Sequence, residues 1–409
     1  MNYFNLIPAI YLYNGKVVDK DTREIKEDGN PVSLATIYDN NGADELLIFD
    51  LSTTDSEHEA NISAMIHIAD AVDIPMIVGG NIKRLEDVKK YIYAGAKKAI
   101  LCSEMNMDLL DEASARFGSE NIALYSDEEV ENSVKEKISL IVSQNSAIKT
   151  DMKVLYIGEQ NIDTFAQSEN AYGASSDTFE KQFDFMKYKA ELKAQNIPVN
   201  VFESPMKFSD FKTNEDKMIP VIVQDYKTDK VLMLAYMNED AFNNTIATGK
   251  MTYYSRSRDE LWVKGESSGH YQYVKELYMD CDVDTMLAKV RQVGVPCHTG
   301  ADTCFFNELV KKEYDNTNPM KVFEDVFQVI LDRKENPKEG SYTNYLFDKG
   351  IDKILKKVGE EATEIVIAAK NPDAQEIKYE ISDFLYHVMV LMAEKGVSWK
   401  EITKELARR

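Results

Sequence analysis

Three of the four cysteines in the chain lie in one short stretch, at Cys281, Cys297 and Cys304. Their separations of sixteen and seven residues differ from the paired spacing of a zinc finger. Thiolates are soft ligands that suit zinc in a reducing compartment, and three of them leave one tetrahedral position open to water. Water on zinc ionises near neutral pH and becomes a nucleophile. The cysteines therefore indicate a catalytic zinc, with three buried cysteines or a structural zinc closed by His298 as alternatives.

Three aspartates alternate with the first of these cysteines. Asp280, Asp282 and Asp284 flank Cys281 at every second position. In a β-strand this spacing places the three carboxylates on one face and the thiol on the other. Oxygen ligands suit Mg²⁺. The stretch therefore predicts a magnesium site beside the zinc site, with a solvated acidic edge as the alternative.

A second set of acids follows a helical periodicity. Apolar residues of 351–369 fall on one stripe, with Glu361 at its edge, Glu364 further round and Glu360 opposite. A second amphipathic stripe follows a short Asn371-Pro372 turn. The polar residues on its flank are Glu380, Asp383 and His387. Antiparallel helices bring such carboxylates together, and converging acids repel unless a cation lies between them. The pattern predicts a Mg²⁺ site, with two solvated amphipathic helices as the alternative.

The elements that must position these residues change character along the chain, and 409 residues exceed one ordinary core. Residues 1–205 alternate apolar strands with amphipathic stretches, which indicates an α/β domain with parallel strands. Residues 206–316 are rich in β-branched and aromatic residues and predict a mainly-β domain. Residues 317–409 predict an all-α domain. The weaker strand candidates of the first domain are 137–143, 153–157 and 198–202.

Composition narrows the classes of partner. A net charge of −22 repels phosphate backbones, so no nucleic-acid partner is expected. No apolar run approaches the length of a membrane span, and the first residues lack the basic start of a signal peptide. We therefore expect a cytoplasmic protein without a membrane partner.

The cysteine region resembles phosphoribosyl-AMP cyclohydrolase. The motifs that carry the resemblance are IPVIVQDYKTDKVLMLAYMN, YYSRSRDELWVKGESSGH, DCDVD and CHTGADTCF. The resemblance implies that the three cysteines bind Zn²⁺ across the interface of a homodimer and that the three aspartates bind Mg²⁺. It also implies attack of zinc hydroxide at C6 of an adenine that carries a ribosyl phosphate on N1, followed by opening of the ring. Histidine as a residue type suits proton transfer near neutral pH, so His270 is the expected catalytic proton carrier, with a satisfied structural side chain as the alternative.

Polar residues between the cyclohydrolase motifs are candidates for substrate binding. Hydroxyls and guanidinium forks can bind phosphate or ribose, although a polar hairpin edge is the alternative. The residues concerned are Ser255, Arg256, Ser257 and Arg258. Trp262 is a candidate for stacking on the base, and Lys264 for contacting phosphate.

The segment 320–409 resembles phosphoribosyl-ATP pyrophosphohydrolase, through GSYTNYLFDKGIDKILKKVGEE and the E-E-x-x-E followed by E-x-x-D. The resemblance implies a dimer or tetramer. It also implies that Mg²⁺ ligands, or a base for water, come from Glu360, Glu361, Glu364, Glu380 and Asp383, with Glu361 and Glu364 as the catalytic candidates. Lys357 is a candidate for phosphate binding, and a solvated lysine pair with Lys356 is equally compatible with the sequence.

The first half of the N-terminal region resembles the histidine-pathway (β/α)8 barrel that makes imidazole glycerol phosphate. The family's acid at the end of the first strand is replaced by Tyr11, and a phenol is a poor acid/base near neutral pH. Beyond Ser126 the pattern is lost, and about 80 residues are too few for four full units. We therefore expect a partial or degenerate barrel. Gly79, Gly80 and Asn81 form a turn that either binds a phosphate or serves packing.

Together these features predict a bifunctional hydrolase of histidine biosynthesis that binds phosphoribosyl-ATP and phosphoribosyl-AMP. The helical domain would release pyrophosphate from phosphoribosyl-ATP, and the β domain would open the adenine ring of the product. Two alternatives stand beside it. One is a general nucleotide pyrophosphohydrolase with a structural zinc domain, and the other is a metabolite-sensing regulatory protein.

Overall fold

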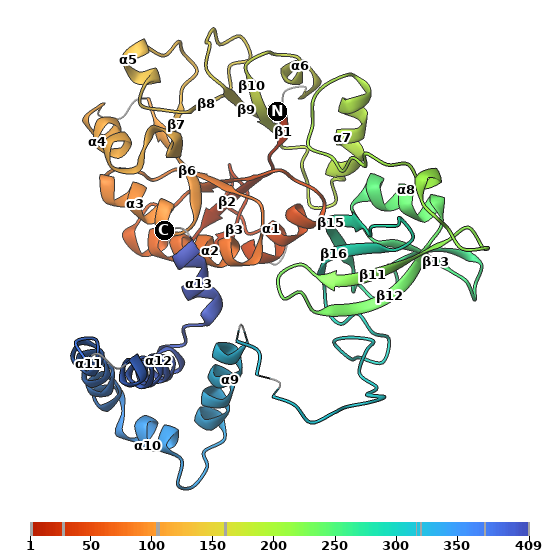
Figure 1. The fold of residues 1–409 in the computed structure, drawn as a ribbon. Helices are drawn as coiled ribbons and strands as arrows, with labels where there is room; N and C mark the ends of the chain where they lie inside the picture. Colours follow the sequence, from red (N-terminus) through yellow and green to blue (C-terminus); the bar gives the residue numbers. More distant parts are fainter. Residues whose placement is uncertain are drawn as a thin grey trace. The chain divides into compact units, whose positions relative to one another are not determined.

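The computed structural model describes residues 3–26, 29–103, 107–158, 162–315, 317–319, 321–371 and 374–407. The chain divides into two compact units, Met1–Glu308 and Leu309–Arg409 (Figure 1). The predicted domain bound at 316 lies outside the described residues, and the three-domain division stays a prediction. Among the described residues, no helix combines the length and the apolar character needed to cross a bilayer.

The first unit begins with a curled sheet of ten strands (Figure 1). The strands are β1 (Asn5–Leu6), β2 (Ala9–Tyr13), β3 (Lys16–Val17), β4 (Leu46–Asp50), β5 (Met76–Gly79), β6 (Ala96–Cys102), β7 (Ile122–Tyr125), β8 (Leu140–Ser143), β9 (Val154–Ile157) and β10 (Ala171–Ser175). All neighbours pair in parallel except β2 and the short β3. β1 pairs with β10 and β2 with β4, while only Ile7 and Pro8 separate β1 from β2. The sheet therefore curls until its two ends meet in one stretch of chain, which confirms the predicted parallel α/β architecture.

Helices alternate with these strands and become short in the second half of the sheet. They are α1 (Pro31–Asn40), α2 (Asp55–Ala71), α3 (Leu85–Tyr93), α4 (Met107–Phe117), α5 (Asn132–Lys135), α6 (Ile162–Ala166) and α7 (Phe185–Ala194). Residues 144–153 join β8 to β9 without a helix. The last three strands, β8, β9 and β10, thus fit in the stretch after Ser126 that we expected to be too short, because the helices that precede them are reduced to about one turn or missing. The predicted strand at 198–202 is wrong, since the last strand of the ten-stranded sheet is β10 and residues 198–202 form no strand.

Two apolar layers hold this region together. A cluster of eight buried side chains lies on one side of the curled sheet, and every member belongs to a strand of the ring or directly precedes β2. Its members are Ile7, Leu47, Ile77, Ile100, Ala123, Leu140, Val142 and Leu155. A larger cluster on the other side includes the helices. This is the inner and outer packing of a barrel-like fold.

The remainder of the first unit is β-rich and contains one α-helix and a 3₁₀ turn (Phe208–Asp210). Its strands are β11 (Ile219–Asp225), β12 (Val231–Met237), β13 (Thr252–Ser255), β14 (Glu260–Val263), β15 (Gln272–Met279) and β16 (Met286–Gln292), and its helix is α8 (Glu239–Thr248). Four strands form a sheet in the order β12-β11-β16-β15, and β13 and β14 form a hairpin. Alternate residues of β11 and β16 are buried, as expected for strands with one face on a core.

The β-rich region contacts the barrel-like region through charged groups at the ends of α1 and α2. The guanidinium of Arg291 lies 2.6 Å from Asp39 Oδ2, near the end of α1. Asp73, just after α2, accepts a hydrogen bond of 2.6 Å from the hydroxyl of Tyr226. Lys227 and Lys275 each lie 3.0 Å from the same carboxylate. These helix ends lie where parallel strands begin, so the contact leaves the carboxyl ends of the strands open.

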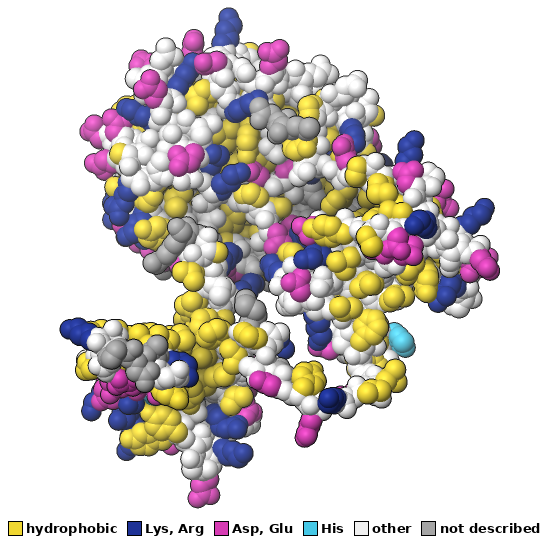
Figure 2. All heavy atoms as spheres, in the orientation of Figure 1, with side chains coloured by type: hydrophobic (Ala, Val, Ile, Leu, Met, Phe, Trp, Pro, Cys, Tyr) yellow, Lys and Arg dark blue, Asp and Glu magenta, His cyan; other side chains and the backbone are white. Residues whose placement is uncertain are grey.

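The regular elements that the structure describes in the second unit are all helices, which confirms the predicted helical C-terminal region. Its helices are α9 (Val322–Glu335), α10 (Tyr342–Lys349), α11 (Ile351–Ala368), α12 (Ala374–Lys395) and α13 (Trp399–Ala407). Its core includes Phe327, Leu346, Ile354 and Val390. Part of the apolar stripe predicted for 351–369 stays exposed, since Leu355 and Val366 keep 49% and 59% of their accessible surface. Hydrophobic side chains accordingly gather on the visible face of this unit (Figure 2).

Candidate functional site

Two of the three predicted zinc cysteines lie together. Cys297 is buried, and its Sγ lies 3.1 Å from the hydroxyl of Thr299. This contact lowers the pKa of Cys297, and Cys304 contributes to the lowering. Burial and the neighbouring Cys297 raise the pKa of Cys304. Lys264 Nζ donates a 2.7 Å hydrogen bond to the carbonyl of Pro296, which places a buried cation beside the two thiols.

The third cysteine lies apart from this pair. Cys281 is exposed in the loop between β15 and β16, with its Sγ 3.2 Å from Asp282 Oδ1. Among the described residues, two groups of at least three possible metal ligands lie within 4.8 Å of one another, and neither contains a cysteine. A single chain therefore presents two of the three thiols as a pair and the third elsewhere.

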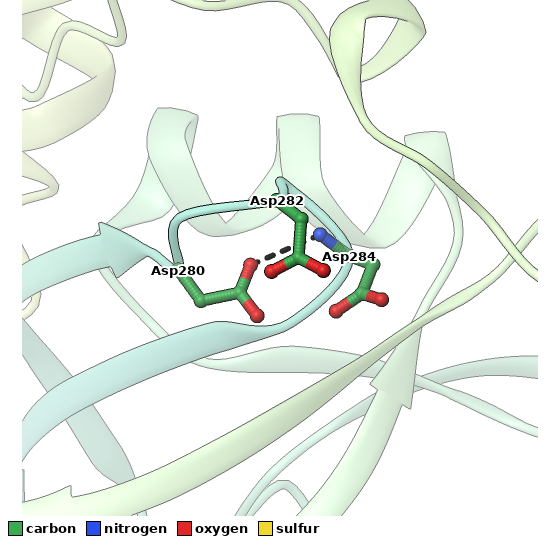
Figure 3. Close-up of side chains that lie close together, drawn as sticks. All are labelled: Asp280, Asp282 and Asp284. Carbon is green, nitrogen blue, oxygen red and sulfur yellow. Dashed lines mark hydrogen bonds between the residues drawn. The ribbon is translucent and has the colours of Figure 1, made fainter.

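The three aspartates converge, although by a different geometry from the one predicted. Asp280, Asp282 and Asp284 offer oxygens within 4.8 Å of one another (Figure 3). The expectation of a strand is wrong, because residues 280–285 form a turn in which Val283 has φ +59°. Asp280 Oδ1 accepts hydrogen bonds from the backbone N–H of Asp284 at 3.0 Å and of Thr285 at 3.2 Å. Burial opposes the effect, but these amides lower the pKa of Asp280.

The predicted substrate-binding residues lie on the β13–β14 hairpin. Ser255 Oγ lies 3.4 Å from Ser257 Oγ and accepts a 3.2 Å hydrogen bond from Arg258 Nε. Trp262 lies between two cations, 5.8 Å from the guanidinium of Arg258 and 5.5 Å from Lys264 Nζ. Trp262 therefore connects the hairpin to the cysteine pair through Lys264.

Arg256 and His270 occupy other positions around this hairpin. The guanidinium of Arg256 lies 4.0 Å above the ring of Tyr236, and the residue lines a cavity of about 760 Å³. The ring of His270 packs on Gly294, since an added Cβ there would lie 2.5 Å from its Cδ2. His270 is thus held against the strand end that leads to Cys297.

The predicted acids of the helical unit form a compact cluster. Glu361, Glu380 and Asp383 offer oxygens within 4.8 Å of one another. Glu361 is 4% exposed. Burial and the charges of Glu361 and Glu380 raise the pKa of Glu364, which shows that Glu364 faces the same cluster. The acids come from the end of α11 and the start of α12, as antiparallel helices require. Pro372 of the predicted turn lies outside the described residues.

Glu360 lies on the cationic side of the cluster. Its carboxylate is 3.0 Å from Lys357 Nζ and 3.3 Å from Lys356 Nζ. These lysines lower its pKa. Lys357 also lies 3.0 Å from Glu361 and therefore offsets part of the negative charge of the cluster.

Two residues without an assigned role join the helical cluster. His387 is buried, and its Nδ1 lies 2.8 Å from the carbonyl oxygen of Asp383 and 3.6 Å from Glu361 Oε1. Its Nε2 lies 3.0 Å from the hydroxyl of Tyr342, at the start of α10. His387 shares the helical flank of the acids, which the sequence indicates. No sequence signal links Tyr342 to them.

Tyr11, on β2, lines a partly open cavity of the barrel-like region. Its ring stacks on Phe49, with centroids 5.5 Å apart. Burial raises the pKa of Tyr11, and the nearby Asp177 adds to the effect. An ion pair of Lys20 with Asp177 lies at the same cavity, which measures about 610 Å³. The phenol is therefore protonated near neutral pH.

The glycine turn after β5 is tightly packed. Gly80 has φ +88°, and an added Cβ would lie 2.3 Å from the carbonyl oxygen of Asp50. Asn81 donates a 2.6 Å hydrogen bond to Ser52 Oγ. Packing therefore accounts for glycine at position 80, while phosphate binding at this turn stays a prediction.

Three family models match the chain. They describe a histidine biosynthesis protein over residues 5–198, phosphoribosyl-AMP cyclohydrolase over 233–306 and phosphoribosyl-ATP pyrophosphohydrolase over 323–409. The first match continues well past Ser126, so the expectation that the barrel pattern ends there is wrong.

Curated relatives match the second half of the chain. Proteins named "Histidine biosynthesis bifunctional protein HisIE" from Thermoanaerobacter pseudethanolicus and Caldanaerobacter subterraneus are 49% and 50% identical over 209 and 200 residues. These matches cover 48% and 49% of this chain, and 97% and 96% of the relatives. A protein of the same name from Lactococcus lactis is 50% identical over 196 residues, which are 48% of this chain and 90% of the relative.

Proposed function

Because the chain belongs to the family of bifunctional histidine biosynthesis proteins HisIE, and is thus both a cyclohydrolase and a pyrophosphohydrolase, we propose how its two sites divide the work. The helical unit releases pyrophosphate from phosphoribosyl-ATP with Mg²⁺ held by the α11–α12 acids. The β-rich region opens the adenine ring of phosphoribosyl-AMP with Zn²⁺ held by cysteines. The observation that carries the proposal is the convergence of one soft and one hard ligand set in the regions that match these two families.

The cysteine pair fits zinc by its chemistry. Cys297 and Cys304 are close enough to perturb one another, and the lowered pKa of Cys297 favours the thiolate that zinc binds. Zinc in this site supplies a hydroxide near neutral pH for addition to C6 of the adenine. His270 moves the proton, Trp262 stacks on the base, and the serines and arginines of the β13–β14 hairpin bind phosphate or ribose.

The third thiol comes from a second copy of the chain. Cys281 is exposed and separate from the pair, so the site with three thiolates is incomplete in one chain. A homodimer in which Cys281 of each copy meets the pair of the other completes two equal sites. The three aspartates beside Cys281 then hold Mg²⁺ at the same interface.

The helical acids fit Mg²⁺. Glu361, Glu380 and Asp383 offer hard oxygen ligands, and loss of solvation together with the charges of Glu361 and Glu380 raises the pKa of Glu364 beside them. Mg²⁺ held by these acids would neutralise charge on the triphosphate during attack by water. Glu361 or Glu364 accepts the proton of that water, and Lys357 contacts phosphate.

The direct test measures both products from phosphoribosyl-ATP with the full chain, Mg²⁺ and Zn²⁺. We expect Glu361→Ala to lose pyrophosphate release by at least about a hundredfold while it still opens the ring of added phosphoribosyl-AMP. We expect Cys297→Ser to show the reverse pattern. The activity that each variant retains shows that the variant is folded. Unchanged pyrophosphate release in Glu361→Ala, or unchanged ring opening in Cys297→Ser, would overturn the corresponding assignment.

We also propose that the barrel-like region does not carry out the cyclase chemistry of its relatives. The half-buried phenol of Tyr11 has a raised pKa and is therefore a poor general acid or base near neutral pH. Absence of product from the cyclase substrate supports this proposal, and turnover that is lost in Tyr11→Phe would contradict it.

A further inference from the structure

Three tyrosine rings lie side by side next to the helical acid cluster, and we call Tyr342, Tyr345 and Tyr386 the tyrosine shelf. The centroid of Tyr342 lies 6.2 Å from that of Tyr345 and 6.5 Å from that of Tyr386, and both ring pairs are inclined by only 23°. Tyr342 and Tyr345 keep 47% and 43% of their surface exposed. Two nearly parallel aromatic rings open to solvent form a surface on which a planar base can stack.

The shelf is joined to the acid cluster by hydrogen bonds. The Tyr342 hydroxyl lies 3.0 Å from Nε2 of His387, whose Nδ1 lies 3.6 Å from Glu361. The Tyr386 hydroxyl lies 2.7 Å from Thr343 Oγ1, which fixes the shelf to α10. The position of the rings relative to the acids is therefore set by the fold.

Two cations lie next to the shelf at Tyr345. Lys349 Nζ and Lys353 Nζ each lie 5.9 Å from the ring centroid of Tyr345. Tyr342, Tyr345 and Lys349 are spaced by three and four residues along α10, so they share one face of that helix. Pairwise contacts therefore connect the acids to His387, then to Tyr342 and Tyr345, and then to the two lysines.

The substrate has the same order of groups. In phosphoribosyl-ATP the triphosphate and its ribose lie on one side of the adenine, and a second ribosyl phosphate on N1 lies on the other. We propose that the tyrosine shelf binds the ribosylated adenine and that Lys349 and Lys353 bind the distal phosphate. This rests on the proposed function of the acid cluster as the triphosphate site. The lysines then distinguish phosphoribosyl-ATP from ordinary nucleoside triphosphates, which lack that phosphate.

The experiment measures kcat/KM for phosphoribosyl-ATP in the full chain with Mg²⁺, together with the inhibition constant of ATP as a competitor. For Lys349→Met combined with Lys353→Met we expect kcat/KM to fall about tenfold while the inhibition constant of ATP stays the same, since ATP has no distal phosphate. For Tyr345→Ala we expect both quantities to worsen, by about 5- to 100-fold, since both ligands carry adenine.

Tyr314→Ala is the matched control, because Tyr314 is 70% exposed and lies before α9 in the same unit. The assignment of the lysines would be overturned if the Lys349→Met, Lys353→Met variant kept its kcat/KM for phosphoribosyl-ATP. It would also be overturned if the affinity of that variant for ATP fell as much as its kcat/KM. Tyr345→Ala with unchanged constants, or with an altered oligomeric state by sedimentation, would overturn the shelf. If the wild-type protein released no pyrophosphate from phosphoribosyl-ATP, the proposed function itself would be wrong.

Discussion

Mixing two variants that we expect to be inactive provides a quantitative test of the proposed zinc site shared between two copies. Cys281→Ser removes the exposed thiol, and Cys297→Ser removes one member of the buried pair. Each homodimer then has two damaged sites, and neither should open the adenine ring. In a mixed dimer, Cys281 of the Cys297→Ser copy meets the intact pair of the Cys281→Ser copy, so one of the two sites is complete.

The expected recovery follows from counting sites. Equal co-expression gives mixed dimers in about half of the population, and each keeps half of its sites, so about one quarter of wild-type ring opening should return. Bound zinc should rise to about the same fraction of the wild-type content. Consumption of phosphoribosyl-AMP and metal analysis of the co-purified proteins measure the two quantities. Pyrophosphate release is the internal control, because both cysteines lie outside the helical unit.

Two results would refute the reasoning in different ways. If Cys281→Ser alone retains full ring opening, this cysteine is not a ligand. If each variant is inactive and the mixture stays inactive although mixed dimers are isolated by two affinity tags, the three thiols do not combine across copies.

Three further predictions concern charge and packing. With metal removed, Glu364→Gln should raise Tm above that of the wild type at neutral pH, because the wild-type carboxylate is ionised there among like charges. This gain in Tm should vanish in acid, where the Glu364 carboxyl with its raised pKa takes up a proton. Calorimetry at neutral and at acidic pH measures both values, and a gain of the same size at both would contradict the prediction. Asp73→Asn should lower the free energy of unfolding by about 1 kcal/mol at neutral pH. That loss should shrink as pH falls through the lowered pKa of Asp73, and urea unfolding that shows no loss would argue against this contact. Gly80→Ala should cost about 1 to 3 kcal/mol, because its φ of +88° and the close Asp50 carbonyl both oppose a Cβ, and an unchanged Tm would contradict that reading.

The sequence predicts the site residues best where a helical periodicity also determines which side of the helix carries them. The acids of α11 and α12 converge as expected, because the 3.6-residue repeat fixes which flank of each helix carries them. The aspartates around Cys281 also converge, but through a turn with a positive φ at Val283 rather than through the alternation of a strand. Spacing alone does not separate these two geometries, since both bring every second side chain to one side.

Other features depend on contacts between distant segments. β10 has the sequence AYGAS, whose small residues lack the apolar run of a typical buried strand, and its partners in β1 and β9 define it. Tyr342 reaches His387 across forty-five positions of the sequence, so no local pattern predicts their contact. The separation of Cys281 from the other two thiols is likewise a property of the folded chain.

The charged contact between the barrel-like region and the β-rich region depends on a part of the chain that the relatives do not match. The relatives are almost fully covered by a match to the second half of this chain, so they have no counterpart of Asp39 or Asp73 to face Lys275 and Arg291. A protein cut before β11 would lack Asp39 and Asp73, so Arg291 and Lys275 would lose these ionic partners.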